Sequence, residues 1–137
     1  MILTLLISLA AHAEMQDGLS VDQVFRRYGH EKGCKMVEMH DTQLHGLRFK
    51  TYKSLTYKRL GKEINDLLKH DRKLAKKIRE VVDEGKVVSG YYMMPTQQKG
   101  QNRYILFSTQ EGGRGAVIYI EGELQPDDII KLCYTRR

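Results

Sequence analysis

Three β-rich runs in the second half of the chain, separated by short polar segments, constrain the fold more than any other feature. The runs span residues 87–94, 103–108 and 116–121. They are rich in Val, Ile, Tyr and Phe, which favour strands. The segments between them, PTQQKGQN and TQEGGRG, are polar and contain glycine, as hairpin connections do. We therefore predict three consecutive antiparallel strands.

Helical patterns lie on both sides of these strands. Residues 20–28 begin with a capping box, Ser20 with Gln23, and Gly29 ends the helix. Residues 60–68 have apolar side chains at helical spacing. After a break, a second helix is predicted from Asp71, its N-cap, to Gly85, with Leu, Ile and Val side chains facing inward. A short helix from Pro126 to Cys133 opens with two acids in its first turn.

Short strands are also expected at residues 34–40 and 54–58. Because the helices precede and follow the strands rather than alternate with them, the fold class is α+β. We predict an antiparallel sheet of four or five strands with helices packed on one face.

The amino-terminal segment has the pattern of an export signal. Residues 2–11 carry no charge, and Ala11-His12-Ala13 provides small residues at the two cleavage-site positions. The apolar run is shorter than the roughly 20 residues that a transmembrane helix needs. We predict a signal peptide at 1–13 and a single periplasmic or secreted domain at 14–137, with no membrane span. The alternative is a buried amino-terminal strand or helix.

Positive charge is concentrated in the middle of the chain. The net charge is +6, and residues 48–79 contain 12 Lys or Arg against 3 Asp or Glu. In the helix predicted from Asp71, bases follow the cap and acids occupy the last turn, which opposes the helix dipole. The candidate anion-binding residues at this predicted N-terminus are Lys69, Arg72, Lys73, Lys76 and Lys77. The alternative is a solvated helix face.

Other chemistry has little support in the residues. Cys34 and Cys133 are either one disulfide, as export would permit, or two thiols. No histidine or cysteine spacing is typical of a metal site, and no serine lies in a nucleophile elbow. The segment NRYILFS lacks the aromatic spacing of an RNA-recognition motif, so nucleic acid is not an expected partner. We expect no cofactor.

Eight segments occur here in a fixed order, namely VFRRYG, GCKMVEMHD, SLTYK, AKKIREVVDEG, VVSGYYMMP, NRYILF, VIYIEGEL and PDDIIKL. In this order they resemble a family of small exported bacterial proteins known only as a domain of unknown function. The resemblance covers nearly all of the chain after the predicted leader. It implies an exported α+β domain and no active-site residue, ligand or partner.

Three classes of function follow. The leading hypothesis is a non-enzymatic binding module that uses residues 48–79 to contact an envelope protein, an anionic lipid or a glycan. The second is a self-associating structural or regulatory protein of the envelope, in which basic and acidic regions pair between copies. The third is an enzyme, whose sign would be a deep pocket lined by two or more convergent ionisable side chains.

Overall fold

The computed structural model describes residues 18–96 and 99–135, and in this part of the chain three α-helices and a six-stranded antiparallel sheet form an α+β fold. The predicted fold class is confirmed. The predicted number of strands is wrong, since the sheet has six strands rather than four or five. The predicted signal peptide, residues 1–13, lies outside the described residues.

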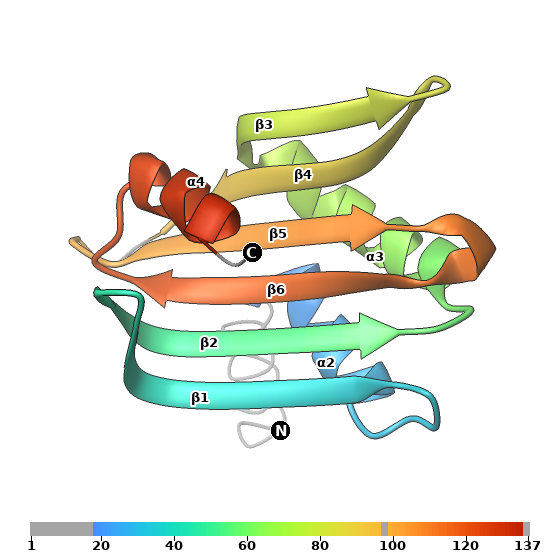
Figure 1. The fold of residues 1–137 in the computed structure, drawn as a ribbon, viewed down its shortest axis with the longest axis horizontal. Helices are drawn as coiled ribbons and strands as arrows, with labels where there is room; N and C mark the ends of the chain where they lie inside the picture. The colour runs from blue at the N-terminus through green and yellow to red at the C-terminus, as the bar shows by residue number, and fades with distance from the viewer. Residues whose placement is uncertain (1–17, 97–98, 136–137) are drawn as a thin grey trace, which may run out of the picture.

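The described elements follow one another along the chain as α2 (Ser20–Tyr28), β1 (Lys35–Leu44), β2 (Leu47–Tyr57), α3 (Gly61–Leu74), β3 (Lys76–Asp83), β4 (Lys86–Met94), β5 (Asn102–Thr109), the 3₁₀ turn η1 (Glu111–Gly113), β6 (Gly115–Gly122) and α4 (Pro126–Thr135). The order across the sheet is β1-β2-β6-β5-β4-β3. After the β1–β2 hairpin, α3 carries the chain to the far edge, and four strands return until β6 pairs with β2 (Figure 1). The three strands predicted from residue 87 onward are confirmed as consecutive antiparallel partners.

The extra strand is β3, and it replaces the helix predicted from Asp71 to Gly85. In the structure α3 continues through Asp71 to Leu74, and the chain then enters β3. Glu84 and Gly85 both have positive φ, 51° and 77°, which is the geometry of a two-residue hairpin turn that suits a tight β3–β4 connection. Val81 and Val82 are 46% and 60% exposed, so these two of the apolar residues assigned to a helix face do not point into a core, whereas Ile78 packs against the core beneath α4.

The helices cover both faces of the sheet, not one face as predicted. In Figure 1, α4 lies in front of the sheet, while α2 and α3 lie behind it. The strands themselves require this arrangement, because their residues are apolar on both sides. In β5, Ile105 and Phe107 belong to the core beneath α2 and α3, whereas Tyr104 and Leu106 belong to the core beneath α4.

Asp71 joins the two helices on the rear face. Its side chain is 1% exposed, and its two carboxylate oxygens accept hydrogen bonds from the backbone N–H groups of Ser20 and Val21 at 2.8 and 2.7 Å. These N–H groups begin α2 and have no partner within that helix. The capping box predicted at Ser20 is therefore wrong, because no side chain of α2 caps the helix and Asp71 of α3 does so instead.

Candidate functional site

The five residues predicted as an anion site lie where α3 ends and β3 begins. We call this surface the basic corner, and its members are Lys69, Arg72, Lys73, Lys76 and Lys77. The first three belong to the last two turns of α3 and the other two open β3. The structure thus brings them onto consecutive elements, but at a helix C-terminus rather than at the N-terminus that was predicted.

Their position changes the electrostatic argument. Arg72 and Lys73 occupy the last turn of α3, where positive charge stabilises the helix dipole. Lys69 pairs with Asp66 at 3.3 Å, and Lys77 pairs with Glu80 at 3.3 Å. The guanidinium of Arg72 lies 5.1 Å from the centre of the Phe107 ring. A structural role therefore accounts for part of this charge, and the unfavourable dipole inferred from the sequence is absent.

Glu80 ties the basic corner to the sheet. The Tyr92 hydroxyl donates a hydrogen bond of 2.6 Å to its carboxylate, and this bond, with the nearby Lys77, holds the pKa of Glu80 below its ordinary value. Burial and the same carboxylate raise the pKa of Tyr92. The start of β3 is thereby fixed against β4, which pairs Lys77 with Tyr92 across the two strands.

A second feature, which the sequence analysis missed, is a cleft of about 420 Å³ between α2 and the β1–β2 hairpin. We call it the charged cleft. Its lining consists of Asp22, Phe25, Arg26, His30, Met36, Glu38 and Lys53. A signal was present in the sequence, because residues 22, 26 and 30 are spaced by four and so share one side of the helix end.

The end of α2 lies close against β1 at the base of this cleft. A Cβ atom at Gly29 would lie 2.5 Å from Sδ of Met36 and 2.5 Å from the backbone oxygen of Phe25, and the second contact, with the fixed backbone, favours glycine here. Phe25 is buried, and the Lys53 ammonium lies 5.9 Å from the centre of its ring. The cleft therefore has an apolar base formed by Phe25 and Met36, and charged side chains surround it.

The acid on the strand side of the charged cleft already has partners. The carboxylate of Glu38 lies 2.8 Å from Nε2 of His40. This hydrogen bond and the charge of Lys53 lower the pKa of Glu38. On the helix side, neither Asp22 nor Arg26 makes a side-chain hydrogen bond or an ion pair within the part of the chain that the structure describes.

Convergent ionisable side chains are what an enzyme would require, so the charged cleft must be weighed as an active site. The residues that line it carry no hydroxyl and no thiol, so the groups left for covalent or acid–base chemistry are the imidazole of His30, the amine of Lys53 and two carboxylates. A lowered pKa also makes Glu38 a weak base near neutral pH. The opposite charges around the cleft suit recognition of a charged ligand.

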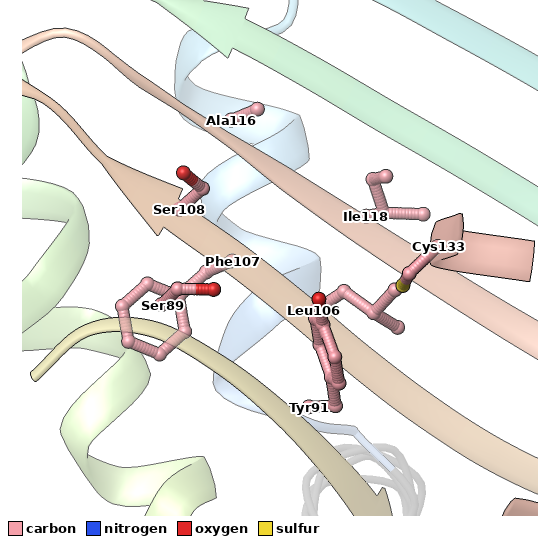
Figure 2. A pocket seen from close by; sticks show the side chains of 8 residues that line it. All are labelled: Ser89, Tyr91, Leu106, Phe107, Ser108, Ala116, Ile118 and Cys133. Atoms are coloured by element: carbon pink, nitrogen blue, oxygen red, sulfur yellow. The ribbon is translucent and has the colours of Figure 1, made fainter. Parts of the chain in front are cut away.

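A third feature is a hollow of about 430 Å³ on the front face of the sheet, beside α4. In Figure 2, Cys133 reaches toward it from α4 at one end, and Ser89 and Ser108 lie at the other. Its base includes the buried residues Leu106 and Ile118. No residue that lines this hollow is charged, so it differs in chemistry from the charged cleft and from the basic corner.

The two cysteines are free thiols that lie on opposite sides of the sheet. Cys34 packs against the core beneath α2 and α3, whereas Cys133 packs against the core beneath α4. A disulfide requires Cα atoms within about 7 Å of each other and side chains that point together. The arrangement therefore gives the predicted disulfide no support.

Two further features are absent from the described residues, namely a membrane-spanning helix and a cluster of metal ligands. None of the described helices is both long enough and apolar enough to span a bilayer. Within residues 18–96 and 99–135, no three His, Cys, Asp or Glu side chains converge as ligands of a metal ion would.

Residues 6–133 match the model of a family of unknown function, DUF6108. The chain belongs to this family. The match covers most of the chain and confirms the predicted resemblance to a domain of unknown function. No curated protein and no solved structure matches the chain. The function must therefore be argued from the surfaces described above.

Proposed function

We propose that this member of the family is a non-enzymatic binding module that contacts an anionic partner through the basic corner. The observation that supports this most directly is the position of Asp71. It is the acid nearest to Arg72 and Lys73 in the sequence, yet its carboxylate is buried and bonded to the start of α2. Its carboxylate therefore caps α2 inside the domain and does not balance the surrounding bases at the surface.

The remaining charges of the basic corner are available to a partner. Lys73 and Lys76 are exposed and make no ion pair among the described residues. The ion pairs of Lys69 and Lys77 join largely exposed lysines to acids, and such surface pairs contribute little and exchange readily. A cluster of this kind attracts negatively charged surfaces over about one Debye length, roughly 8–10 Å at ordinary salt.

The proposed partner carries closely spaced negative charge, as an anionic lipid surface, an acidic glycan or the acidic face of an envelope protein does. This proposal includes export of the domain. Its basis is the apolar segment 2–11 followed by Ala11-His12-Ala13. Mass spectrometry of protein from its own host should find a chain that begins at Glu14. A chain that keeps residues 1–13 would contradict export.

Vesicle binding tests the basic corner. The parent protein should sediment with phosphatidylglycerol vesicles at low salt, should be released as salt increases, and should ignore phosphatidylcholine vesicles. Each surface lysine near an anionic membrane contributes about 1 kcal/mol. Changing Lys73 and Lys76 together to glutamine should therefore weaken binding about 30-fold. Parallel measurements with heparin separate a glycan from a lipid partner.

A matched control removes the same charge elsewhere. Lys32 and Lys86 are exposed and lie outside the basic corner, so their double change to glutamine should weaken binding much less than the change of Lys73 and Lys76 does. Equal losses in the two double variants would mean that net charge, not the basic corner, drives binding. No binding by the parent to any anionic probe would remove the proposal.

Self-association is the second candidate function, and one observation favours it. β3 is an edge strand, and its Val81 and Val82 are largely exposed. Two register irregularities interrupt the strand, and such bulges normally protect an edge from pairing. Light scattering across a range of salt separates the possibilities. A charge-paired oligomer dissociates as ionic strength rises, an apolar one does not, and a monomer at all concentrations excludes both.

A further inference from the structure

We propose that the charged cleft binds a small zwitterion of the α-amino acid type, with an apolar side chain, as a free amino acid or as the end of a short peptide. This goes beyond the basic corner, because none of the five residues of the basic corner lines the charged cleft. The charged cleft adjoins β1, whereas the basic corner adjoins β3.

The size of the cleft indicates a small ligand. Its volume of about 420 Å³ lies within the range of roughly 300–1,000 Å³ that small-molecule sites occupy. The apolar surface that an aliphatic or aromatic side chain could contact is supplied mainly by the partly buried Met36, because Phe25 beneath it is only 3% exposed. A bare inorganic ion would leave most of this space and all of this apolar surface unused.

The pairing of charges indicates a zwitterion rather than an anion. Glu38 is matched by His40 and by Lys53, so the strand side of the cleft is internally balanced. The helix side presents one acid and one base, Asp22 and Arg26, without a side-chain hydrogen bond or an ion pair among the described residues. A ligand ammonium group would pair with the carboxylate of Asp22, and a ligand carboxylate would accept hydrogen bonds from the guanidinium of Arg26.

The position of these two residues supports a shared ligand. Asp22 and Arg26 are one turn apart on α2, a spacing at which two such side chains can pair directly. In the structure they do not pair, and both line the same cleft. A zwitterion placed between the two side chains in the cleft would satisfy both groups at once.

Four probes dissect the proposed recognition. Leucine carries both charges, N-acetylleucine lacks the ammonium, leucine amide lacks the carboxylate, and the dipeptide Leu-Leu separates the two charges. Amide chemical shifts in ¹⁵N-labelled full-length protein report binding at Phe25, Gly29, Met36 and Lys53. We expect leucine or Leu-Leu to shift these signals and to bind at least about tenfold more tightly than either singly charged probe. The stronger of the two identifies a free amino acid or a peptide end.

Two substitutions make the test specific to each charge. Asp22→Asn should weaken leucine about tenfold while it leaves N-acetylleucine unchanged. Arg26→Gln should weaken leucine and N-acetylleucine alike while it leaves leucine amide unchanged. Arg27→Gln is the matched control, because Arg27 is exposed on α2 and does not line the cleft. Thermal melts verify that each variant is folded.

Each outcome decides the proposal. The crossed pattern of losses establishes the pairing of Asp22 with the ammonium and of Arg26 with the carboxylate. Binding of N-acetylleucine as strong as that of leucine would show an anion site and would overturn the zwitterion. No shift with any probe at millimolar concentration, or equal loss in Arg27→Gln, would overturn the site. Lys73→Gln with Lys76→Gln should have no effect, which separates this proposal from the basic corner.

Discussion

The two faces of the sheet are built from the same strands but are covered in different ways. The rear core, beneath α2 and α3, contains 14 buried residues among those described, whereas the front core beneath α4 contains eight. α2 and α3 also contact each other and share Asp71, whereas α4 covers part of the front face beside an open hollow. A sheet can therefore be covered on both sides by helical layers of unequal extent.

A substitution of one buried aliphatic residue on each face should reveal this inequality most clearly. Leu68 of α3 is 1% exposed and Ile129 of α4 is fully buried. Truncation of such residues to alanine costs about 2–5 kcal/mol, and the cost falls where the surroundings can close the cavity. We expect Leu68→Ala near the top of that range and Ile129→Ala near the bottom, because the other described helices lie on the opposite face from α4 and α4 borders a hollow.

Urea denaturation with a common m-value measures both free energies of unfolding. A loss in Ile129→Ala as large as that in Leu68→Ala would mean that α4 is held as firmly as the paired helices. The comparison between the faces would then concern their extent and not their rigidity.

The helix caps differ between the faces in the same sense. Asp71 is buried and caps α2 from another helix. Asp128 caps α4 from within the first turn of α4, where its carboxylate accepts an exposed hydrogen bond of 2.8 Å from the N–H of Gln125. Asp71→Ala leaves one buried and one part-buried N–H group without their acceptor and should cost about 1–3 kcal/mol. Asp128→Ala, whose N–H partner is solvated, should cost about 0.5–1 kcal/mol.

The pH dependence of the Asp71→Ala loss identifies the state of the carboxyl group. Burial raises the pKa of Asp71 above its ordinary value near 3.8, against the lowering effect of the two N–H donors of Ser20 and Val21. A carboxyl group whose pKa is higher in the folded state binds protons more tightly there. Its contribution to stability is therefore largest below the unfolded pKa and decreases as pH rises through the folded pKa. A loss that grows with pH would mean that the N–H donors outweigh burial.

One tyrosine hydroxyl on each face allows a comparison in which the substitutions are matched and the expected change in the free energy of unfolding is smaller. Tyr92 on the rear face donates to Glu80, and Tyr104 on the front face donates a hydrogen bond of 2.5 Å to the backbone carbonyl of Leu124 just before α4. Leu124 also accepts a hydrogen bond from Asn102, so its carbonyl keeps a partner when Tyr104 is changed. We expect Tyr92→Phe to cost about 1.5 kcal/mol and Tyr104→Phe about 0.5 kcal/mol in urea denaturation. The reverse order would place the tighter hydroxyl contact on the front face.

The front face also explains which parts of the fold could be read from the sequence. The strands from residue 87 onward were predictable because their hairpin connections are local, and the start of α4 was predictable because Pro126 and its acids act within one turn. Which face a helix covers is a tertiary property. The apolar residues on both sides of β5 and β6 indicate two covered faces, whereas the order of helices and strands along the chain does not show which face each helix covers.

The predictions of β3 and of the candidate sites were wrong or incomplete for related reasons. The apolar positions of residues 71–84 fit a helical period by chance, while the better signal was the mirrored valine pairs on either side of Asp83-Glu84-Gly85-Lys86. The residues of the basic corner were predictable because they are consecutive, although the helix end assigned to them was wrong. The charged cleft combines α2 with two strands, and no local pattern reports such an assembly.

The smallest expected effect concerns the reactivity of the two thiols and not the free energy of unfolding. Cys34 on the rear face is partly buried, and burial, together with the nearby Glu31, raises the pKa of its thiol against a backbone hydrogen bond at Lys58. Since the thiolate is the reactive form, a Cys133→Ser variant should react with a disulfide reagent at neutral pH more slowly than a free cysteine does. The rate should keep rising as the pH passes 9, the ordinary value for this thiol. Intact mass of the unreduced parent should show both thiols, and a mass lower by two hydrogens would mean that the sheet does not separate Cys34 from Cys133 as described.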